Sequence, residues 1–302
     1  MSGKIAARVS MSHIPFDEAL ERPTPIMFPV GERKLAWQMR TGNYEPLKSH
    51  KAIVRLSPSG NSAHVLNVVR TTYKLVLNRE LYEMVHAAIQ KRVRLAQLHD
   101  AYCVDKIAHY GRICWREYIF PSITCRVGNH VRPIAFRIIV QNSYGSSALR
   151  MHSGAIDFFC TNGMIRGEFE SVYRRHTSGL VVGDLSENID RALVAFADSE
   201  SKWRRWSHTP VTREQTMMFF REIVKSPTLV DKLADRWLYE IEDRGQNLWS
   251  VYSTLTYYSS HNEGDFAVRT RDDAGVDAAM HQRELDVAKW VQHDAWRVME
   301  TA

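Results

Sequence analysis

The stretch that decides the predicted fold is residues 137–164, Arg-Ile-Ile-Val-Gln-Asn-Ser-Tyr-Gly-Ser-Ser-Ala-Leu-Arg-Met-His-Ser-Gly-Ala-Ile-Asp-Phe-Phe-Cys-Thr-Asn-Gly-Met. A first limb, residues 136–140, is apolar and β-branched over the length of a strand. Small residues at 142–145 allow the chain to reverse, and a second limb runs over 148–159. Asn162-Gly163 then predicts left-handed backbone and a change of element. We therefore expect a hairpin in a mostly antiparallel sheet.

More strands and one helix precede this hairpin. Residues 51–56 and 64–69 are apolar runs on either side of a turn, which is a hairpin signal. Asn78 is expected to cap a helix that runs from 79 to about 98, because apolar residues recur there at helical spacing. The remaining central strands are predicted at 112–120, 122–127 and 133–141.

The chain turns helical after Gly183. Helices are predicted at 185–206, 212–224, 228–244 and 276–299, whereas the aromatic run 247–260 fits either a buried helix or a strand. The fold class is α+β: a mostly antiparallel central sheet, a β-meander with a preceding helix, followed by a helical C-terminal region. Three parts are expected: a Pro-rich N-terminal arm (1–50), an α+β core (51–183) and a mainly helical region packed on that core (184–302).

Composition indicates a soluble globular protein. Of 302 residues, 44% are hydrophobic and 25% charged, and no run approaches the roughly 18 apolar residues of a membrane span. The first residues lack the apolar core of a secretory signal. Four cysteines (Cys103, Cys114, Cys125 and Cys160) show no CxxC spacing and are expected to be reduced packing residues. We expect a cytoplasmic protein without a membrane partner.

Arginine supplies much of the formal charge of +6, and it recurs along the predicted central strands. If alternate positions face outward, one sheet face carries arginines beside Tyr118, Tyr144 and Phe158. Positive charge suits phosphates and aromatic rings suit stacked bases, so such a face would bind a single nucleic-acid strand. The alternative is an ordinary solvated sheet face.

The residues predicted to bind the strand are basic or aromatic. They come from the central strands, from the segment beyond the Asn-Gly turn and from the helix after Gly183. The set is Arg116, Arg126, Arg137, Arg150, Arg174, Arg175, Lys202, Arg204, Arg205, Tyr118, Tyr144 and Trp206.

Motifs for cofactor and metal chemistry are missing from the sequence. It contains no GxxxxGK[ST] or GxGxxG loop, no HxE with PCxxC and no GxSxG elbow. We therefore expect no cofactor, no metal and no catalytic residue. One alternative remains an enzyme, a metal-dependent nuclease or a nucleotide-modifying protein using Asp157, Glu168, Glu170 and His176. Another is a structural or host-interaction protein whose basic face only aids solubility.

Several short motifs together resemble one known family. They are residues 65–73 (VLNVVRTTY), Leu77-Asn78, 142–147 (NSYGSS), 159–164 (FCTNGM), 174–177 (RRHT) and 255–261 (LTYYSSH). In this order they resemble the phage- and plasmid-related proteins grouped under a domain of unknown function, of the 932 type. The resemblance covers residues 50 to 265. It implies a mobile-element origin, with the host-cell cytoplasm as the location if a phage encodes the chain, and it supplies no catalytic residue.

A second similarity is topological. A helix, then a meander opening at Tyr110-Gly111, then later helices, looks like the core of phage and eukaryotic single-strand annealing proteins. That resemblance implies a homo-oligomer that holds single-stranded DNA in a basic groove and anneals it without nucleotide hydrolysis. The second helix that follows the sheet in those proteins is not clear here, because residues 166–182 are ambiguous.

Overall fold

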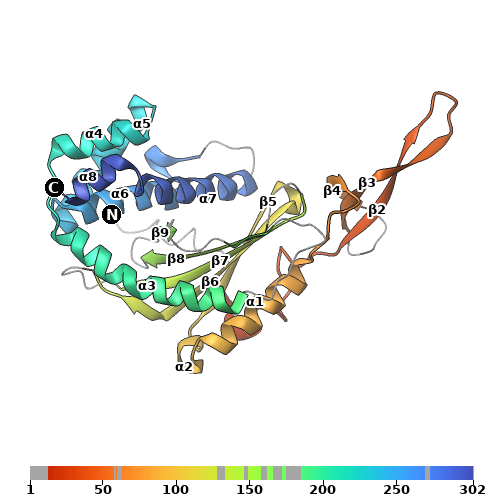
Figure 1. Cartoon of the computed structure of the whole chain (residues 1–302), viewed down its shortest axis with the longest axis horizontal. Coiled ribbons are helices and arrows are strands. Elements are labelled where there is room, and N and C mark those ends of the chain that lie inside the picture. The colour runs from red at the N-terminus through yellow and green to blue at the C-terminus, as the bar shows by residue number, and fades with distance from the viewer. Residues whose placement is uncertain are drawn as a thin grey trace, which may run out of the picture. The chain divides into compact units, whose positions relative to one another are not determined.

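The fold is α+β, as the sequence predicts, with antiparallel sheets in the N-terminal half and mostly helices in the C-terminal half (Figure 1). The computed structural model describes residues 13–57, 59, 63–127, 133–145, 149–157, 162–165, 172–174, 185–268 and 273–301. No helix in these ranges is both long and apolar enough to cross a membrane.

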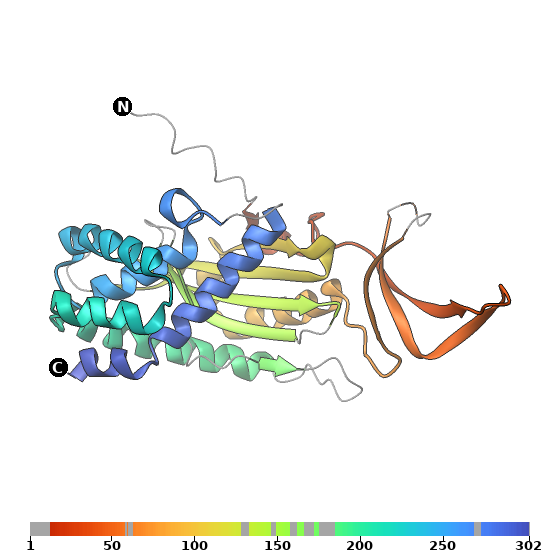
Figure 2. The same cartoon turned by 90° about the horizontal axis from the view of Figure 1, so that it is seen from above.

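The larger sheet has seven strands in the order β1-β5-β6-β7-β8-β10, with β9 also paired to β8. Figure 2 shows β5 to β8 lying side by side. The two limbs of the fold-deciding stretch occupy β7 and β8, which are neighbours as predicted. The strands are β1 (Ile14–Pro15), β5 (Tyr102–Ala108), β6 (Ile113–Cys125), β7 (Ile134–Ser143), β8 (Leu149–Asp157), β9 (Asn162–Ile165) and β10 (Val172–Arg174).

Strand β6 corrects one prediction. Two strands were expected on either side of Pro121, but a single strand passes through it. Proline lacks a backbone N–H and is tolerated where no neighbouring strand needs that donor. The pairing of β6 with β5 ends at Ile119, which faces Tyr102, so Pro121 lies beyond that ladder.

A smaller antiparallel sheet has the order β2 (Val30–Gln38), β3 (Tyr44–Leu56) and β4 (Ala63–Arg70). The sequence predicted β4 and the second half of β3 but missed β2. Strands β2 and β3 form a long hairpin, drawn in red and orange in Figure 1. Its turn is closed by the N–H of Met39, which donates to the carbonyl of Asn43 at 2.7 Å, and Gly42 supplies the left-handed residue with φ of 85°.

The helices agree with the predicted regions, with three differences. The single helix expected at 276–299 is wrong, because a turn at 291–293 divides this segment into two helices. The other two differences concern the first helix. Asn78 does not cap the first helix: the cap position is Leu77, and Asn78 lies buried inside the first turn. The expected helix 79–98 breaks at Val93, which is extended. The helices are α1 (Asn78–Arg92), α2 (Leu95–Leu98), α3 (Leu185–His208), α4 (Arg213–Ile223), α5 (Pro227–Arg244), α6 (Leu248–Ser260), α7 (Asp273–Trp290) and α8 (Asp294–Thr301), with short 3-10 turns at Phe16–Glu18 (η1), His109–Gly111 (η2) and Gly264–Phe266 (η3). The aromatic run 247–260 is thus a helix.

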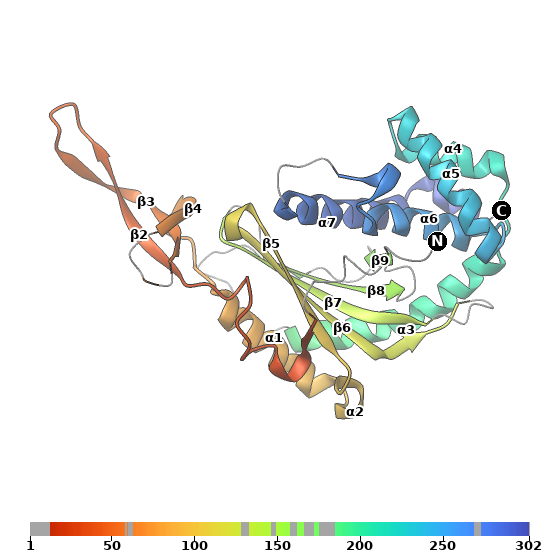
Figure 3. The ribbon, with the colours of Figure 1, turned by 180° about the vertical axis from the view of Figure 1, so that it is seen from behind.

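The described chain divides into two compact units. Unit 1 takes its residues from Met1–Ile119, Ile138–His152 and Ser171–Ile189, and unit 2 takes the rest. Within unit 1, α1 lies along the sheet (Figure 3). The hydroxyl of Tyr82, on α1, approaches the carbonyl of Cys114, and Phe16 of η1 stacks on His86 with 3.8 Å between ring centroids.

The core of unit 2 is aromatic. Trp206 of α3 packs against Tyr252 of α6 and Trp296 of α8, with centroids 5.1 and 5.0 Å apart. Phe136 of β7 stacks near Phe120 of β6 at 5.5 Å. Such pairs add to the burial of large apolar area and hold the C-terminal helices together.

Cys103, Cys114 and Cys125 are buried and free, which agrees with their predicted role in packing. Cys160 lies outside the described residues.

Candidate nucleic-acid interface

Arg116 does not face solvent. Its guanidinium is fully buried and forms a bidentate ion pair with Asp105 on the neighbouring strand, with Nε and Nη2 each 2.8 Å from a carboxylate oxygen. Nη1 donates to the carbonyl of Ala19 at 2.8 Å, and the ring of Tyr82 lies beneath. Burial disfavours the charged form, but the hydrogen bonds and charge of Asp105 outweigh it, so the pKa of Arg116 is raised. The predicted exposed position of Arg116 is therefore wrong.

Arg137 is also buried. Its Nη2 lies 2.9 Å from Oε1 of Glu284, on α7, and only 2% of the side chain is exposed. Every residue of β7 is buried, so neither face of this strand is open to solvent. Arg137 is therefore a structural arginine of unit 2 and offers no open surface to a strand of DNA.

The three predicted stacking residues belong to the core. Tyr118 and Tyr144 are buried in unit 1, and the Tyr144 hydroxyl accepts a hydrogen bond from the backbone N–H of Asn78 at 3.0 Å. Trp206 is buried in unit 2, where its indole N–H donates to Glu300 at 2.8 Å. None of these rings is open to a nucleic-acid base.

The predicted residues that are exposed lie mainly on α3. Arg204 forms an ion pair with Glu200 at 3.0 Å, and Arg205 forms one with Glu300 at 2.7 Å. Lys202 sits over the ring of Trp206 at 5.1 Å from its centroid. Their charges are partly balanced by carboxylates of the same unit.

The other predicted residues take varied places. Arg126 is exposed just after β6, and Arg150 is partly buried on β8. Arg174 forms a backbone pair with Leu149, and Arg175 lies outside the described residues. The alternative catalytic residues Glu168, Glu170 and His176 lie outside them too, and for Asp157 only the backbone is described. In the described part of the chain no group of three His, Cys, Asp or Glu side chains could hold a metal ion.

The tip of the β2–β3 hairpin carries basic and aromatic side chains that were not predicted to belong to a binding site. Trp37 and Tyr44 are 54% and 71% exposed, values unusual for rings of this size. Arg40, in the turn, and Lys48, further along β3, are exposed too. Trp37 pairs with Glu45 and Tyr44 pairs with Gln38, so the two rings lie on opposite faces of the hairpin. One feature of the sequence could have indicated this surface. Aromatic and basic residues lie on both sides of Thr41-Gly42-Asn43, which is a turn sequence. We call Trp37, Arg40, Tyr44 and Lys48 the hairpin tip.

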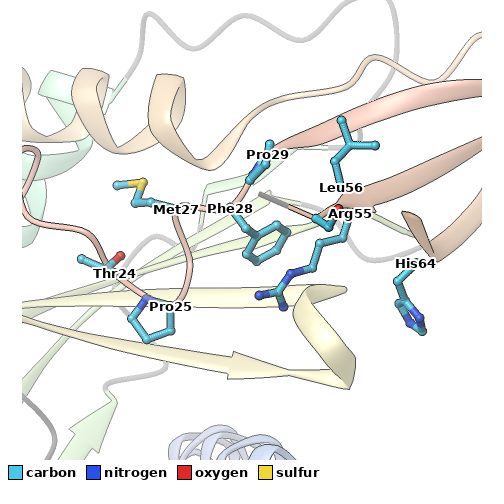
Figure 4. Close-up of a pocket in the computed structure, with 9 residues that line it drawn as sticks. Thr24, Pro25, Met27, Phe28, Pro29, Arg55, Leu56 and His64 are labelled. Carbon is cyan, nitrogen blue, oxygen red and sulfur yellow. The ribbon is translucent and has the colours of Figure 1, made fainter. Parts of the chain in front are cut away.

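A pocket of about 390 Å³ opens at the other end of the same hairpin, within unit 1 (Figure 4). We call it the base pocket. Apolar side chains form most of its wall, with Arg55 and His64 as its basic residues. The lining residues are Thr24, Pro25, Met27, Phe28, Pro29, Arg55, Leu56, Ser57 and His64.

Arg55 is the centre of the base pocket. Its guanidinium lies 4.0 Å above the ring of Phe28, and Nη1 donates to the carbonyl of Tyr110 at 3.1 Å. Strand pairing places His64 directly opposite Arg55, on β4. Figure 4 shows the Arg55 guanidinium beside the Phe28 ring, with His64 on the other side of Arg55.

The turn that Arg55 holds has left-handed backbone at three consecutive residues. The φ angles of His109, Tyr110 and Gly111 are 51°, 59° and 100°. Non-glycine residues rarely adopt this conformation, and such residues often mark functional sites. A Cβ at Gly111 would lie 2.4 Å from Cζ of Phe28, so only glycine allows the turn to approach the pocket wall.

A buried polar network supports the pocket from inside unit 1. The Asn142 side-chain amide donates to the Val76 carbonyl at 2.9 Å and to Oδ1 of Asn78 at 2.8 Å. Asn78 in turn donates to the Ile26 carbonyl, and Tyr73 donates to that of Ser143 at 3.0 Å. The network supplies hydrogen bonds to polar groups that would otherwise be costly to bury. Through Asn78 it also links Ile26, in the segment before β2, to Asn142 near the end of β7.

These features define an α+β protein with an exposed basic hairpin and a polar-rimmed pocket at its base. The chain belongs to the family of a domain of unknown function, DUF932, which matches residues 65–285. Strands β2 and β3 precede the matched residues, whereas the Asn78–Asn142 network lies inside them. No solved structure matches the chain significantly.

Proposed function

We propose that this protein binds single-stranded DNA through the hairpin tip. The observation that carries the proposal is the exposure of two large rings, Trp37 and Tyr44, on a hairpin that also exposes the cations Arg40 and Lys48. Rings stack on bases of any sequence, and cations contact phosphates. Binding would therefore show little sequence preference.

The charge balance of the hairpin supports the same proposal. Residues 30–56 contain six lysines and arginines against two carboxylates. One carboxylate, Glu32, pairs with Lys51 at 2.6 Å. Within the described residues Lys34, Arg40 and Lys48 form no ion pair, so their charge is available to an anionic partner.

The wider proposal is a phage or plasmid protein that acts as a homo-oligomer and promotes annealing or recombination without ATP. Its support is the resemblance of the motif order and of the helix-plus-meander topology. Strands β2 and β4 are the two edges of the small sheet, and β4 exposes Val65 and Val68. Exposed edges and apolar side chains are surfaces on which chains associate. Light scattering over a range of concentrations, with and without DNA, tests this: one subunit's mass throughout would contradict it.

The binding proposal is tested by fluorescence anisotropy with labelled oligo(dT) at low salt. Removing the rings in Trp37→Ala/Tyr44→Ala should weaken binding, because stacking contributes about 1–3 kcal/mol for each base. The matched control is Tyr239→Ala, which removes an equally exposed ring from α5. Wild-type affinity in the double variant would show that the tip is not the site. No binding of the wild-type protein to any oligonucleotide would overturn the function itself.

A further inference from the structure

We infer that the base pocket binds one nucleotide, with the base against Phe28 and the phosphate at Arg55. The inference extends the proposed function, because a strand bound by the hairpin is one source of that nucleotide. A free mononucleotide has the same chemistry and is the other source.

The size and lining of the pocket fit such a ligand. Small-molecule sites are clefts of about 300–1,000 Å³ lined by apolar side chains with a few polar groups. The base pocket has about 390 Å³ and the apolar residues Met27, Phe28 and Leu56. A planar ring of nucleobase size can pack against this wall.

The charge of the pocket selects an anion. Arg55 makes one hydrogen bond among the described residues, from Nη1 to Tyr110, and a guanidinium has five N–H donors. None of the described lining residues is acidic. Arginine matches phosphate geometry by a planar pair of donors, so a phosphate is the anion expected there.

Two further polar groups surround the same space. His64 is paired with Arg55 on the neighbouring strand. The His64 and Tyr110 ring centroids are 5.2 Å apart, and Tyr110 is 70% exposed. Thr24, another lining residue, has a buried hydroxyl without a hydrogen-bond partner in the described part of the chain. Buried polar atoms are nearly always paired, so an unpaired one at a pocket is a place where a ligand atom can bind.

The site is held ready before a ligand arrives. Arg55 is fixed between the Phe28 ring and the Tyr110 carbonyl, and the left-handed turn leaves room for Phe28 only because residue 111 is glycine. Side chains held in place lose less conformational freedom on binding. The strained turn thus has a role in placing Arg55 and Phe28.

The experiment compares two ligands of the pocket. Thymidine 5′-monophosphate and thymidine are titrated by calorimetry into wild-type protein, Arg55→Gln, Phe28→Ala and the control Arg79→Gln, an exposed arginine of α1. In parallel, oligo(dT) and the same oligomer with one abasic position are titrated into the same proteins. Circular dichroism checks that each variant is folded, and Arg55→Lys replaces Arg55→Gln if that variant is not.

The expected result is binding of the monophosphate, at least tenfold weaker for thymidine and for the Arg55 and Phe28 variants but unchanged for Arg79→Gln. If the pocket accepts only a nucleotide that is part of a bound strand, the monophosphate does not bind. The Arg55 and Phe28 variants then lose affinity for oligo(dT), and they bind oligo(dT) and the abasic oligomer equally well. The inference is overturned if the pocket variants behave like Arg79→Gln with both ligands. In that case loss of oligo(dT) binding in the hairpin-tip variant would leave the proposed function standing. If no oligonucleotide binds wild-type protein, the monophosphate titration alone decides the inference.

Discussion

The guanidinium of Arg116 and the carboxylate of Asp105 meet through two parallel hydrogen bonds of 2.8 Å on directly paired positions of β6 and β5. Both side chains are almost completely buried, at 0% and 2% exposure. Such a pair matters for stability mainly because the loss of either partner would leave the other as a buried, unpaired charge.

Asp105→Ala should therefore lower the free energy of unfolding by about 3–5 kcal/mol. The measurement is urea unfolding followed by circular dichroism. The matched control is Glu83→Ala, which breaks the exposed Arg79–Glu83 pair and should cost less than about 1 kcal/mol. Replacing both partners, as Asp105→Leu/Arg116→Met, should recover much of the loss. Equal small effects of the Asp105 and Glu83 variants would contradict this account.

Stability should fall at mildly acidic pH because of His86. Burial, and then the charge of Arg116, lowers the pKa of His86 to about 4 from its ordinary 6.5. The folded state keeps this histidine neutral while the unfolded state takes up a proton below pH 6.5, so stability is lost as the pH falls from 6.5 toward 4. Between pH 8 and pH 5 the loss from this group is about 2 kcal/mol.

Urea unfolding at the two pH values measures that loss. His86→Gln should remove about 2 kcal/mol of the pH dependence, and the control His99→Gln, at an exposed histidine, should keep it. An unchanged pH dependence in His86→Gln would rule out this group as the cause.

The three described cysteines should not react in the folded protein. Burial raises the pKa of Cys103, Cys114 and Cys125 to about 12 each, and only the thiolate is a strong nucleophile. In a Cys160→Ser background, a chromogenic disulfide reagent at pH 8 should release no colour until guanidinium is added, and then three equivalents. Rapid reaction of even one thiol without denaturant would show that a described cysteine is accessible.

Salt dependence should separate the two groups of exposed cations. Arg40→Ala/Lys48→Ala at the hairpin tip should reduce the slope of log affinity against log salt by about 0.7 per lost phosphate contact. Arg204→Ala/Arg205→Ala on α3 should change it less, because each arginine already has a carboxylate partner. Anisotropy titrations at several salt concentrations measure both slopes. An equal reduction would place the α3 arginines in the binding surface.

Much of the fold was predictable because its signals are local. Alternation and turn residues marked β7 and β8, and helical spacing marked α3 to α5. The burial of Arg116 and Arg137 was not predictable, because alternation separates the two faces of a strand but does not show whether either face is covered. Their partners lie on other elements: Asp105 is on β5, a strand that was not predicted, and Glu284 is on α7, far along the sequence.

Strand β2 was missed for a related reason. Residues 1–50 were predicted to be a Pro-rich arm, and proline usually interrupts regular structure, yet Pro46 lies inside β3, opposite Ala36. The pairing of β3 with β4 begins only at His50, so Pro46 stands where β3 has a neighbour on one side alone. Whether proline is tolerated at such a position depends on how far the neighbouring strand β4 extends, and no local sequence pattern shows that length.

The Asn78–Asn142 contact has a consequence for how the protein ages. The Asn142 amide nitrogen donates to two acceptors, and its oxygen accepts from the N–H of Ser143 at 2.9 Å. Spontaneous deamidation would replace that nitrogen by oxygen and set it against the Asn78 oxygen and the Val76 carbonyl. The fold opposes this reaction, since the attacking N–H of Ser143 is held in a strand. If the change occurred in an unfolded chain, however, refolding would have to bury three acceptors against one another: the new oxygen at residue 142, the Asn78 oxygen and the Val76 carbonyl. Chemical damage at a single amide would therefore be retained as misfolded protein.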